Sequence, residues 1–398
     1  MSKQVQDAYI VAATRTPVGK APRGFFRNTR PDDLLAHVLK RVVAQAPGID
    51  VSRIDDAIIG CAMPEAEQGM NVARIGVLLA GLPNTVAAQT INRFCSSGLQ
   101  AVALAADQIR LGNADLMLAG GTESMSMVPM MGNKVAMAPS VFDNDHVAIA
   151  YGMGITAEKV AEEWKVGRED QDAFALASHQ KALAAIAAGE FREEISPYTV
   201  RSRQPVPGGN TVRVVEKLVD TDEGPRADTS PEGLAKLRPV FRMGGSVTAG
   251  NSSQMSDGAG AVLLASEQAI KDYGLTPLAR FVSFSVAGVR PEVMGIGPVE
   301  AIPKALKQAG LTQDRLDWIE LNEAFAAQAL AVIRTCGLDP AKVNPLGGAI
   351  ALGHPLGATG AIRTATLVHG LRRRKQKYGM VTMCIGTGMG AAGIFEAL

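Results

Sequence analysis

Hydrophobic positions along the chain alternate between short continuous runs and helical spacing. Residues 9–13 (YIVAA) form an apolar run typical of a buried strand. Residues 31–43 then place Leu35, Val38 and Val42 on one face of a predicted helix. This change of period within 35 residues of the start is typical of a strand followed by a covering helix.

The same alternation continues toward the middle of the chain. Strands are predicted at 55–62, at 90–95 and at 115–121, and a helix is predicted from about 97 to 111, ending near Gly112. Strands that alternate with helices in this way predict an α/β layered fold.

An internal repeat is visible at long range. Residues 49–60 (IDVSRIDDAIIG) resemble residues 310–321 (GLTQDRLDWIEL), and pairing Arg53 with Arg315 gives an offset of 315 − 53 = 262. Two copies of one βα unit are therefore predicted, because self-similarity at a fixed offset indicates structural duplication.

The repeat also places unusual residues at corresponding positions. The offset of 262 carries Cys95 into the glycine-rich loop at position 357. Residues 115–121 pair with 380–386 at an offset of 265. Each copy is thus expected to end a strand at a turn rich in glycine.

A different stretch separates the copies and predicts three units. Residues 122–250 hold several methionines, an alanine-rich helix at about 169–188 and a proline-containing polar segment, which indicates an inserted loop domain. The N-terminal core half is then 1–121 plus about 251–270, and the C-terminal half is 271–398. The methionines at 125, 127, 130, 131 and 137 are expected to serve as adaptable packing.

Composition narrows the class of protein. The 398 residues are 47% hydrophobic and 20% charged, and the formal net charge is +1, which argues against a nucleic-acid-binding surface. No run of 18 apolar residues and no secretion signal is visible, so a cytoplasmic protein without membrane spans is expected. The four cysteines, at 61, 95, 336 and 384, are too dispersed for a disulfide framework or a metal site.

Cys95 is the first candidate for chemistry. It lies in NRFCSSGLQAV, where a predicted strand gives way to a helix. Unpaired N–H groups and the helix dipole favour a thiolate there, which is the nucleophilic form of cysteine. The alternative is a buried cysteine that only packs.

Two further candidates lie in glycine-dense turns. His354 falls within NPLGGAIALGHPLGATGA, where a loop imidazole can reach a substrate and exchange protons near neutrality. Cys384 lies in MCIGTGMGAAG at the end of a strand, followed by Gly386. These glycines do not make a dinucleotide-binding motif, because the chain to position 398 leaves no room for the helix, the second strand and the acidic ribose partner that such a motif needs downstream.

The segment NEAFAAQAL adds two polar candidates. Asn322 offers an amide that can orient a water, and Glu323 is either a general base or a structural carboxylate. Solvated or core roles are expected for His37 and His179, and packing roles for Cys61 and Cys336.

Four segments in order, NRFCSSGLQAV, NEAFAAQAL, GGAIALGHPLGATG and CIGTGMG, together resemble the signature segments of the thiolase family. The resemblance covers nearly the whole chain. It implies a duplicated α/β/α/β/α core with an inserted loop domain. It also implies coenzyme A as a co-substrate without a permanently bound cofactor, and a homodimer or homotetramer with possible β-oxidation partners.

The resemblance also assigns residue roles. Cys95 matches the acyl-accepting nucleophile, His354 its activating base, and Cys384 the acid and base at the α-carbon. Asn322 matches the residue that holds a water, and the N–H of Gly386 joins that of Cys95 at a second oxyanion.

A coenzyme A site is implied in the same way. Arg226 matches an arginine beside the nucleotide, and Ser253 matches a serine facing the pantetheine. The residues that match the channel lining are Phe241, Ala249, Ala324 and Phe325. Family members often carry a serine where this chain has Gly233, so one polar contact fewer to coenzyme A is expected.

The function implied is thiolytic cleavage of a 3-ketoacyl-CoA to acetyl-CoA and a shortened acyl-CoA. The run 93–100 (RFCSSGLQ) resembles the degradative branch, and the segment 124–145 has one basic residue, Lys134. Its methionines and Val135 predict activity on chains beyond four carbons. The alternatives are an acetoacetyl-CoA thiolase, a decarboxylating ketoacyl synthase, which Cys384 argues against, and a non-catalytic acyl-CoA-binding protein.

Overall fold

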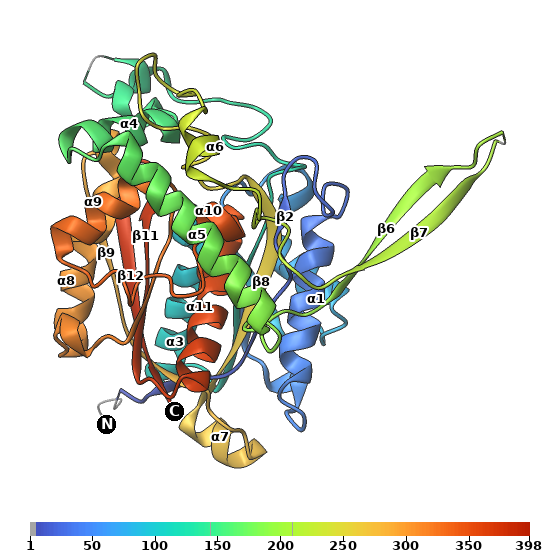
Figure 1. The fold of residues 1–398 in the computed structure, drawn as a ribbon. Helices are drawn as coiled ribbons and strands as arrows, with labels where there is room; N and C mark the ends of the chain where they lie inside the picture. Colours follow the sequence, from blue (N-terminus) through green and yellow to red (C-terminus); the bar gives the residue numbers. More distant parts are fainter. Residues whose placement is uncertain (1–4, 144, 209) are drawn as a thin grey trace.

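A computed structural model describes residues 5–143, 145–208 and 210–398. In these residues one mixed sheet of ten strands runs through the molecule, with nine in the order β10-β11-β12-β9-β1-β8-β5-β3-β4 and β2 (Gly19–Lys20) paired to β8 (Figure 1). The nine strands are β1 (Ala8–Arg15), β3 (Asp56–Gly60), β4 (Ala87–Ile91), β5 (Leu116–Ser124), β8 (Ser256–Ser266), β9 (Ala279–Gly288), β10 (Trp318–Leu321), β11 (Tyr378–Ile385) and β12 (Met389–Ala397).

The sheet consists of two halves with the same topology. In the first half the order is β4-β3-β5-β8-β1, where β3 pairs in parallel with both β4 and β5. In the second half the order is β10-β11-β12-β9, and a parallel bridge from Ile319 to Val343 takes the place of β4. The halves meet at β1 and β9, where only Tyr9 and Ile10 pair. The predicted duplication is therefore confirmed.

Strand register fixes the offset between the copies. Asp56 pairs with Met117 in the first half, and Trp318 pairs with Gly379 in the second. The offsets are 318 − 56 = 262 and 379 − 117 = 262. The predicted offset of 262 is confirmed, whereas the pairing of 115–121 with 380–386 at 265 is wrong by three residues. Both strands are almost entirely buried, so their continuous apolar pattern does not distinguish neighbouring registers.

Helices form three layers, two on the outer faces of the half-sheets and one between them, which confirms the predicted layered fold. Buried side chains of α1 and α2 pack on one face of the first half, and those of α8 and α9 pack on one face of the second. Helices α3 and α11 lie between the halves (Figure 1). Their bounds are α1 (Pro31–Ala44), α2 (Val72–Leu79), α3 (Ser97–Arg110), α8 (Gly297–Ala309), α9 (Ala326–Cys336) and α11 (Leu356–Arg373).

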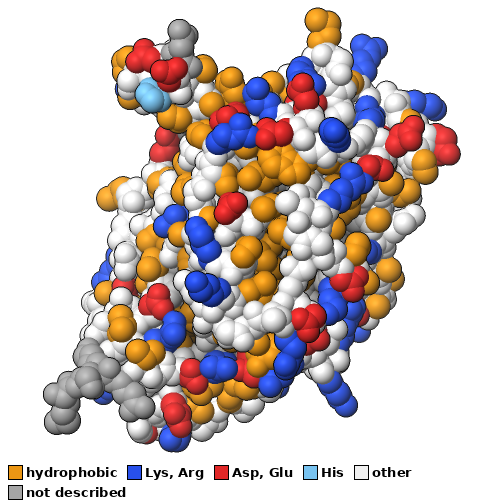
Figure 2. Space-filling view, turned by 90° about the vertical axis from the view of Figure 1, so that its left-hand side faces the viewer, with side chains coloured by type: hydrophobic (Ala, Val, Ile, Leu, Met, Phe, Trp, Pro, Cys, Tyr) orange, Lys and Arg blue, Asp and Glu red, His pale blue; other side chains and the backbone are white. Residues whose placement is uncertain are grey.

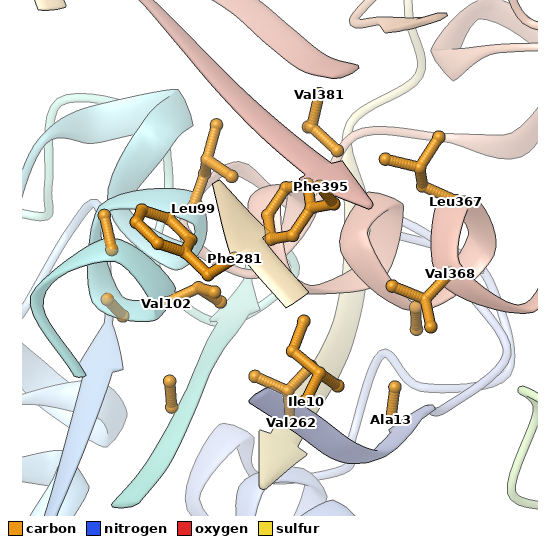
Figure 3. Close-up of a cluster of buried hydrophobic side chains, with 14 of the residues drawn as sticks. Ile10, Ala13, Leu99, Val102, Val262, Phe281, Leu367, Val368, Val381 and Phe395 are labelled. Carbon is orange, nitrogen blue, oxygen red and sulfur yellow. The ribbon is translucent and has the colours of Figure 1, made fainter. Parts of the chain in front are cut away.

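The central layer holds the main hydrophobic core. Leu99 of α3 and Leu367 of α11 are fully buried there among side chains from both half-sheets (Figure 3). Phe281 of β9 and Phe395 of β12 pack edge to face, with ring centroids 5.9 Å apart. Burial of such apolar area is the main force that holds the layers together.

Glycines let α3 and α11 approach each other closely. A Cβ built on Gly98 of α3 would lie 2.7 Å from the backbone nitrogen of Ala361. A Cβ on Gly360 of α11 would overlap the backbone nitrogen of Leu99. The glycines of the motif at 344–361 thus bring the start of α11 against the start of α3.

Replacing Gly360 with alanine should destabilise the protein. The new methyl group meets backbone rather than a movable side chain, so we expect a loss of about 1–3 kcal/mol in the free energy of unfolding. Gly167 before α5 (Arg168–Ala188) is the matched control, because its φ is −67° and a Cβ there meets no atom within 4 Å. Urea denaturation of Gly360→Ala and Gly167→Ala measures both effects. Equal midpoints would contradict the close-approach explanation.

The segment between β5 and β8 covers one end of the sheet. It contains α4 (Met153–Glu163), α5 and the short α6 (Pro231–Ala235). Helix α5 confirms the predicted alanine-rich helix and ends at Gly189, whose φ of 72° suits the left-handed C-cap. A hairpin of β6 (Tyr198–Pro205) and β7 (Val212–Val219) projects away from the body (Figure 1). A short helix, α7 (Glu267–Tyr273), links β8 to β9.

Charge on the surface is mixed. The face in Figure 2 carries acidic and basic side chains interspersed, with hydrophobic ones gathered near its middle. No helix among the described residues is long and apolar enough to span a membrane. Within the same residues, no group of three or more His, Cys, Asp or Glu side chains could hold a metal ion.

Candidate active site

A strained turn presents Cys95. Strand β4 ends at Ile91, four residues earlier than the predicted strand, and residues 94–96 form a 3₁₀ turn before α3. Phe94 has a φ of 42°, a left-handed conformation that costs energy for a bulky side chain. Ser97 stabilises the turn, because its Oγ accepts from the N–H of Arg93 at 2.9 Å and donates to the carbonyl of Phe94 at 2.7 Å.

The protonation state of Cys95 differs from the sequence expectation. Burial raises the pKa of its thiol to about 11, although hydrogen bonds from the backbone N–H groups of Gly386 and Cys95 itself lower it. Desolvation thus outweighs the N–H groups at the helix start, which favour the thiolate. The thiol would need a base to remove its proton before it could act as a nucleophile.

The opposite wall of the site is the turn after β11. Thr387 has a φ of 65° and Gly388 a φ of 90°, so this turn is also held in a left-handed conformation. A Cβ built on Gly386 would lie 3.7 Å from the sulfur of Met153 and 3.8 Å from the ring of Phe94. Gly386 therefore faces the turn that carries Cys95, which explains how its N–H reaches the sulfur.

Cys384 lies beside Cys95 and is completely buried. Burial raises the pKa of the Cys384 thiol well above its usual range, and the charge of an ionised Cys95 raises it further. The two sulfurs are thus close enough to influence each other, although they come from opposite halves of the chain. Cys384 packs in one cluster with Ala324, Phe325 and Met153.

His354 and Asn322 form a third part of the site. Asn322 Nδ2 lies 3.2 Å from His354 Nε2, and the N–H of Asn322 bonds to the carbonyl of Thr382, two residues before Cys384. Burial, followed by the charge of Arg363, lowers the pKa of His354 to about 3. The imidazole is therefore neutral at physiological pH and can accept a proton.

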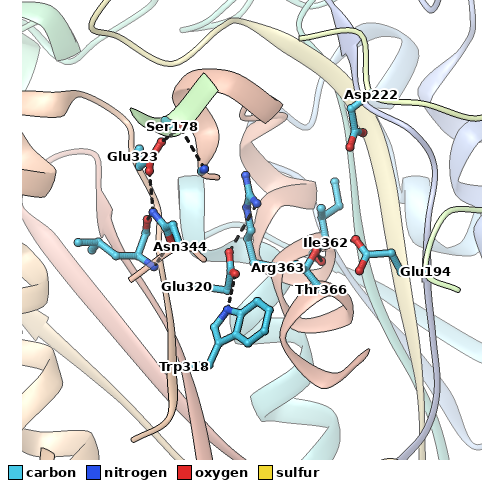
Figure 4. Close-up of polar contacts among 12 residues, drawn as sticks. Ser178, Glu194, Asp222, Trp318, Glu320, Glu323, Asn344, Ile362, Arg363 and Thr366 are labelled. Carbon is cyan, nitrogen blue, oxygen red and sulfur yellow. Dashed lines mark hydrogen bonds and ion pairs between the residues drawn. The ribbon is translucent and has the colours of Figure 1, made fainter. Parts of the chain in front are cut away.

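Glu323 has a different environment from its neighbour Asn322. Its carboxylate accepts hydrogen bonds from Ser178 Oγ at 2.7 Å and Asn344 Nδ2 at 2.8 Å (Figure 4). It also accepts from the N–H of Ile350 at 3.2 Å. These partners tie α5 and the loop before His354 to the end of β10. Glu323 was expected to be either a general base or a structural carboxylate, and these hydrogen bonds fit the structural role.

Sequence reasoning missed Glu123 at the end of β5. This carboxylate is fully buried, accepts the N–H groups of Ala62 and Gly357 at 2.8 Å each, and is bonded by Gln68. It joins the N-terminus of α11 to the first half-sheet, and its charge raises the pKa of Cys95. The available signal was a single charged residue near the end of the otherwise uncharged strand LMLAGGTES.

Most of the candidate coenzyme A residues lie near the cluster that contains Cys384. The N–H of Ser253 donates to the carbonyl of Ala324 at 3.0 Å, which lies next to Phe325. Phe241 is 40% exposed and packs edge to face with Phe325, with ring centroids 6.1 Å apart. Ala249 is exposed on the same connecting segment. Four of the six candidates, Phe241, Ser253, Ala324 and Phe325, thus belong to the cluster that contains Cys384 or contact it directly.

Arg226 lies farther out. Its side chain is exposed and pairs with Asp228 at 3.4 Å, while its N–H bonds to His179 Nδ1 at 3.2 Å. Gln254 Nε2 bridges the carbonyls of Gly224 and Ala351, the latter in α10 (Ala349–Leu352) just before His354. The segment that carries Arg226 is thus anchored to the histidine loop.

Family comparison agrees with the motifs. Residues 8–268 match the family described as "Thiolase, N-terminal domain". Residues 275–397 match "Thiolase, C-terminal domain". The boundary between the two matches falls at α7, between the two halves of the sheet.

Similar proteins are known in several organisms. The chain is 53% identical to the 3-ketoacyl-CoA thiolase of Bacillus subtilis, over 98% of this chain and 100% of that one. It is 48% identical to the peroxisomal 3-ketoacyl-CoA thiolase A of mouse, over 98% and 91%. The crystal structure of the Bacillus anthracis acetyl-CoA acetyltransferase superposes with a TM-score of 0.89 at 40% identity, covering all of both chains.

Proposed function

The chain belongs to the thiolase family, and we propose that it cleaves 3-ketoacyl-CoA with coenzyme A to give acetyl-CoA and a shortened acyl-CoA. One observation carries the proposal. The N–H groups of Cys95 and Gly386 approach the Cys95 sulfur, next to the place that a thioester oxyanion would take, and a second buried thiol, Cys384, is near enough for its pKa to respond to the charge of Cys95.

The first half-reaction breaks the carbon–carbon bond. His354 Nε2 takes the proton of the Cys95 thiol as the sulfur attacks the 3-keto carbon. The C2–C3 bond then breaks and its electron pair moves into the enolate of acetyl-CoA. The new Nε2–H of His354 and a water held by Asn322 stabilise the enolate oxygen, and Cys384 protonates its carbon.

The second half-reaction releases the acyl group. The proton held by His354 first returns to the Cys384 thiolate, so that the imidazole is neutral again. Coenzyme A enters, His354 takes its thiol proton, and the new thiolate attacks the acyl-Cys95 thioester. Cys95 leaves as a thiolate and regains the proton from His354, which restores the resting state. Two half-reactions through one covalent intermediate give ping-pong kinetics.

Buried polar groups support the water on Asn322. Asn322 Oδ1 is buried and has no protein partner among the described residues. An unpartnered buried oxygen costs free energy, which an ordered water would relieve. The coenzyme A residues Arg226, Phe241, Ala249, Ser253, Ala324 and Phe325 are proposed to line the approach. A glycine at 233 leaves one polar contact fewer there.

The test of the proposal is direct. The purified protein is mixed with a 3-ketoacyl-CoA and free coenzyme A, and acetyl-CoA formation is followed by chromatography. Formation of acetyl-CoA only when both substrates are present is expected. Tight binding of acyl-CoA without turnover would favour the non-catalytic alternative instead.

We further propose the setting in which this chemistry occurs. The division into 1–121 with about 251–270, 122–250 and 271–398 is kept as the domain assignment, with the inserted unit contributing the coenzyme A site. A dimer or tetramer acting in the cytoplasm is proposed from the family resemblance, with coenzyme A as the co-substrate and no permanent cofactor.

Substrate length distinguishes this proposal from its nearest alternative, an acetoacetyl-CoA thiolase. In the segment 124–145, Met130, Met131 and Val135 are exposed apolar side chains, and Lys134 is the one basic residue. Each enclosed methylene contributes about 0.8 kcal/mol, so four extra carbons can change kcat/KM by roughly two orders of magnitude. We expect thiolysis of an eight-carbon 3-ketoacyl-CoA to equal or exceed that of the four-carbon substrate.

The measurement is kcat/KM for both substrates. Val135→Lys is an informative variant, because a cation on this surface should lower kcat/KM for the eight-carbon substrate more than for the four-carbon one. Exclusive turnover of the four-carbon substrate would reassign the protein to acetoacetyl-CoA thiolysis.

A further inference from the structure

The hydrogen bonds at Nδ1 of His354 define which tautomer the imidazole adopts. His354 Nδ1 lies 2.6 Å from the hydroxyl oxygen of Thr359, and both residues are at most 4% exposed. Thr359 Oγ1 in turn lies 3.1 Å from the carbonyl oxygen of Pro355, one helical turn back. The side chains therefore form a short relay from the imidazole to the N-cap carbonyl of α11.

The donor and the acceptor in each of these two hydrogen bonds follow from counting the available hydrogens. A threonine hydroxyl has one hydrogen, and the carbonyl of Pro355 can only accept, so the hydrogen lies on the Thr359–Pro355 contact. The same oxygen must then accept from His354, which places a hydrogen on Nδ1. His354 Nε2 is left with a lone pair.

The contact at Nε2, on the other side of the ring, agrees with a hydrogen on Nδ1. Asn322 Nδ2 faces His354 Nε2 at 3.2 Å and can donate to its lone pair. The backbone N–H of His354 donates to Ser256 Oγ at 3.1 Å, which anchors the residue from β8. Both contacts are consistent with a ring held in one orientation, with Nε2 available for a proton.

We propose that Thr359 is a positioning residue for the reaction: its hydroxyl holds His354 as the Nδ1–H tautomer and so keeps Nε2 free to take the proton from Cys95. This inference rests on the proposed function, in which His354 is the base. The relay needs no change when His354 becomes an imidazolium, because Nδ1–H still donates to Thr359 and Nε2 gains the second hydrogen.

The surroundings explain why a neutral hydroxyl serves this purpose. Arg363 on α11 is the charged group whose field acts on the ring, and it disfavours the imidazolium. Glu320 of β10 pairs with Arg363 at 3.5 Å and bonds to Trp318 Nε1 (Figure 4). No carboxylate among the described residues hydrogen-bonds to His354. A short-lived imidazolium returns its proton readily, as each half-reaction requires.

The test compares a side chain that keeps the hydroxyl group at position 359 with one that has a methyl group in its place. Thr359→Val keeps the shape but removes the acceptor, whereas Thr359→Ser keeps the hydroxyl. Rapid-quench mass spectrometry gives the rate at which an acyl-CoA acylates Cys95. We expect Thr359→Val to lower this rate and kcat by about 10- to 100-fold, as outer partners of functional histidines do, with KM for coenzyme A unchanged. Thr359→Ser should restore the rate to near the wild-type value.

The same helix offers a matched control. Thr364 of α11 is fully buried and bonds to the carbonyl of Gly360 at 2.8 Å, the same backward geometry without a histidine. Thr364→Val makes the identical chemical change one and a half turns away and should leave acylation unchanged. If it slows acylation as much as Thr359→Val does, the effect is general to the helix and the proposal is overturned.

Other outcomes are equally decisive. A folded Thr359→Val variant with wild-type acylation, or a Thr359→Ser variant as slow as the valine variant, overturns the proposal. If Thr359→Val does not fold, Thr359→Ala against Thr359→Ser carries the same comparison. A wild-type protein that never forms an acyl-enzyme would instead overturn the proposed function.

Discussion

Replacing Cys95 with alanine should abolish turnover while leaving the protein folded. The sulfur is the atom proposed to carry the acyl group, so both the acyl label and thiolysis should disappear. We expect kcat to fall by at least about 10⁴-fold, because removing a nucleophile costs far more than removing a positioning group. Incubation with substrate followed by peptide mass spectrometry measures the label, and circular dichroism measures the fold.

Cys336 provides the control for this variant. Burial raises the pKa of its thiol to about 11, the same value as for Cys95, but it lies at the end of α9 away from both strained turns. Cys336→Ala should therefore keep full activity and full labelling of Cys95. Acylation of Cys384 with Cys95 unmodified would reverse the two roles.

Much of the fold was readable from periodicity. The run at 9–13, the helix at 31–43 and the alanine-rich helix at 169–188 all appear as β1, α1 and α5. These elements have long, regular patterns and clear ends, such as Gly189. The end of β4 was misplaced because residues 92–95 are fixed by the turn rather than by local strand preference.

The site could be predicted from the sequence where a reactive side chain lies in a segment that contains glycines. Cys95, His354 and Cys384 each stand in a segment whose glycines permit close backbone approach, and such coincidence is uncommon by chance. Their partners were less visible. Glu123 contacts Gly357 across 234 residues, and nothing in its own segment indicates this partner. Sequence spacing alone does not encode a contact made only by packing two half-sheets around α3 and α11.

Electrostatics was the least predictable property. The position of Cys95 before a helix suggested a thiolate, but the sign of a pKa shift depends on how completely the site is covered. Phe94 belongs to the same turn as Cys95, whereas Gly386 and the buried side chains of Cys384 and His354 come from segments far away in the sequence. The covered sulfur therefore needs a base, the role that we propose for His354.

Replacing Cys384 with serine should separate the two halves of the chemistry. Cys95, His354 and Thr359 remain, so an acyl-CoA donor should still acylate Cys95. Exchange of the α-protons of acetyl-CoA with solvent should fall by about 10²–10⁴-fold, since a serine hydroxyl is too weak an acid and its alkoxide too unfavourable to replace the thiol. Loss of the methyl signal in deuterated buffer measures this exchange by proton NMR.

The geometry explains why the effect should be confined to the carbon acid step. Cys384 is completely buried on β11, and an oxygen in place of its sulfur fits the same space without disturbing the turn that carries Gly386. Cys336→Ser, the same exchange on α9, should change neither acylation nor proton exchange. If Cys384→Ser exchanges α-protons at the wild-type rate, another group must act on the carbon, and the pairing of two thiols across the halves of this fold would need a different explanation.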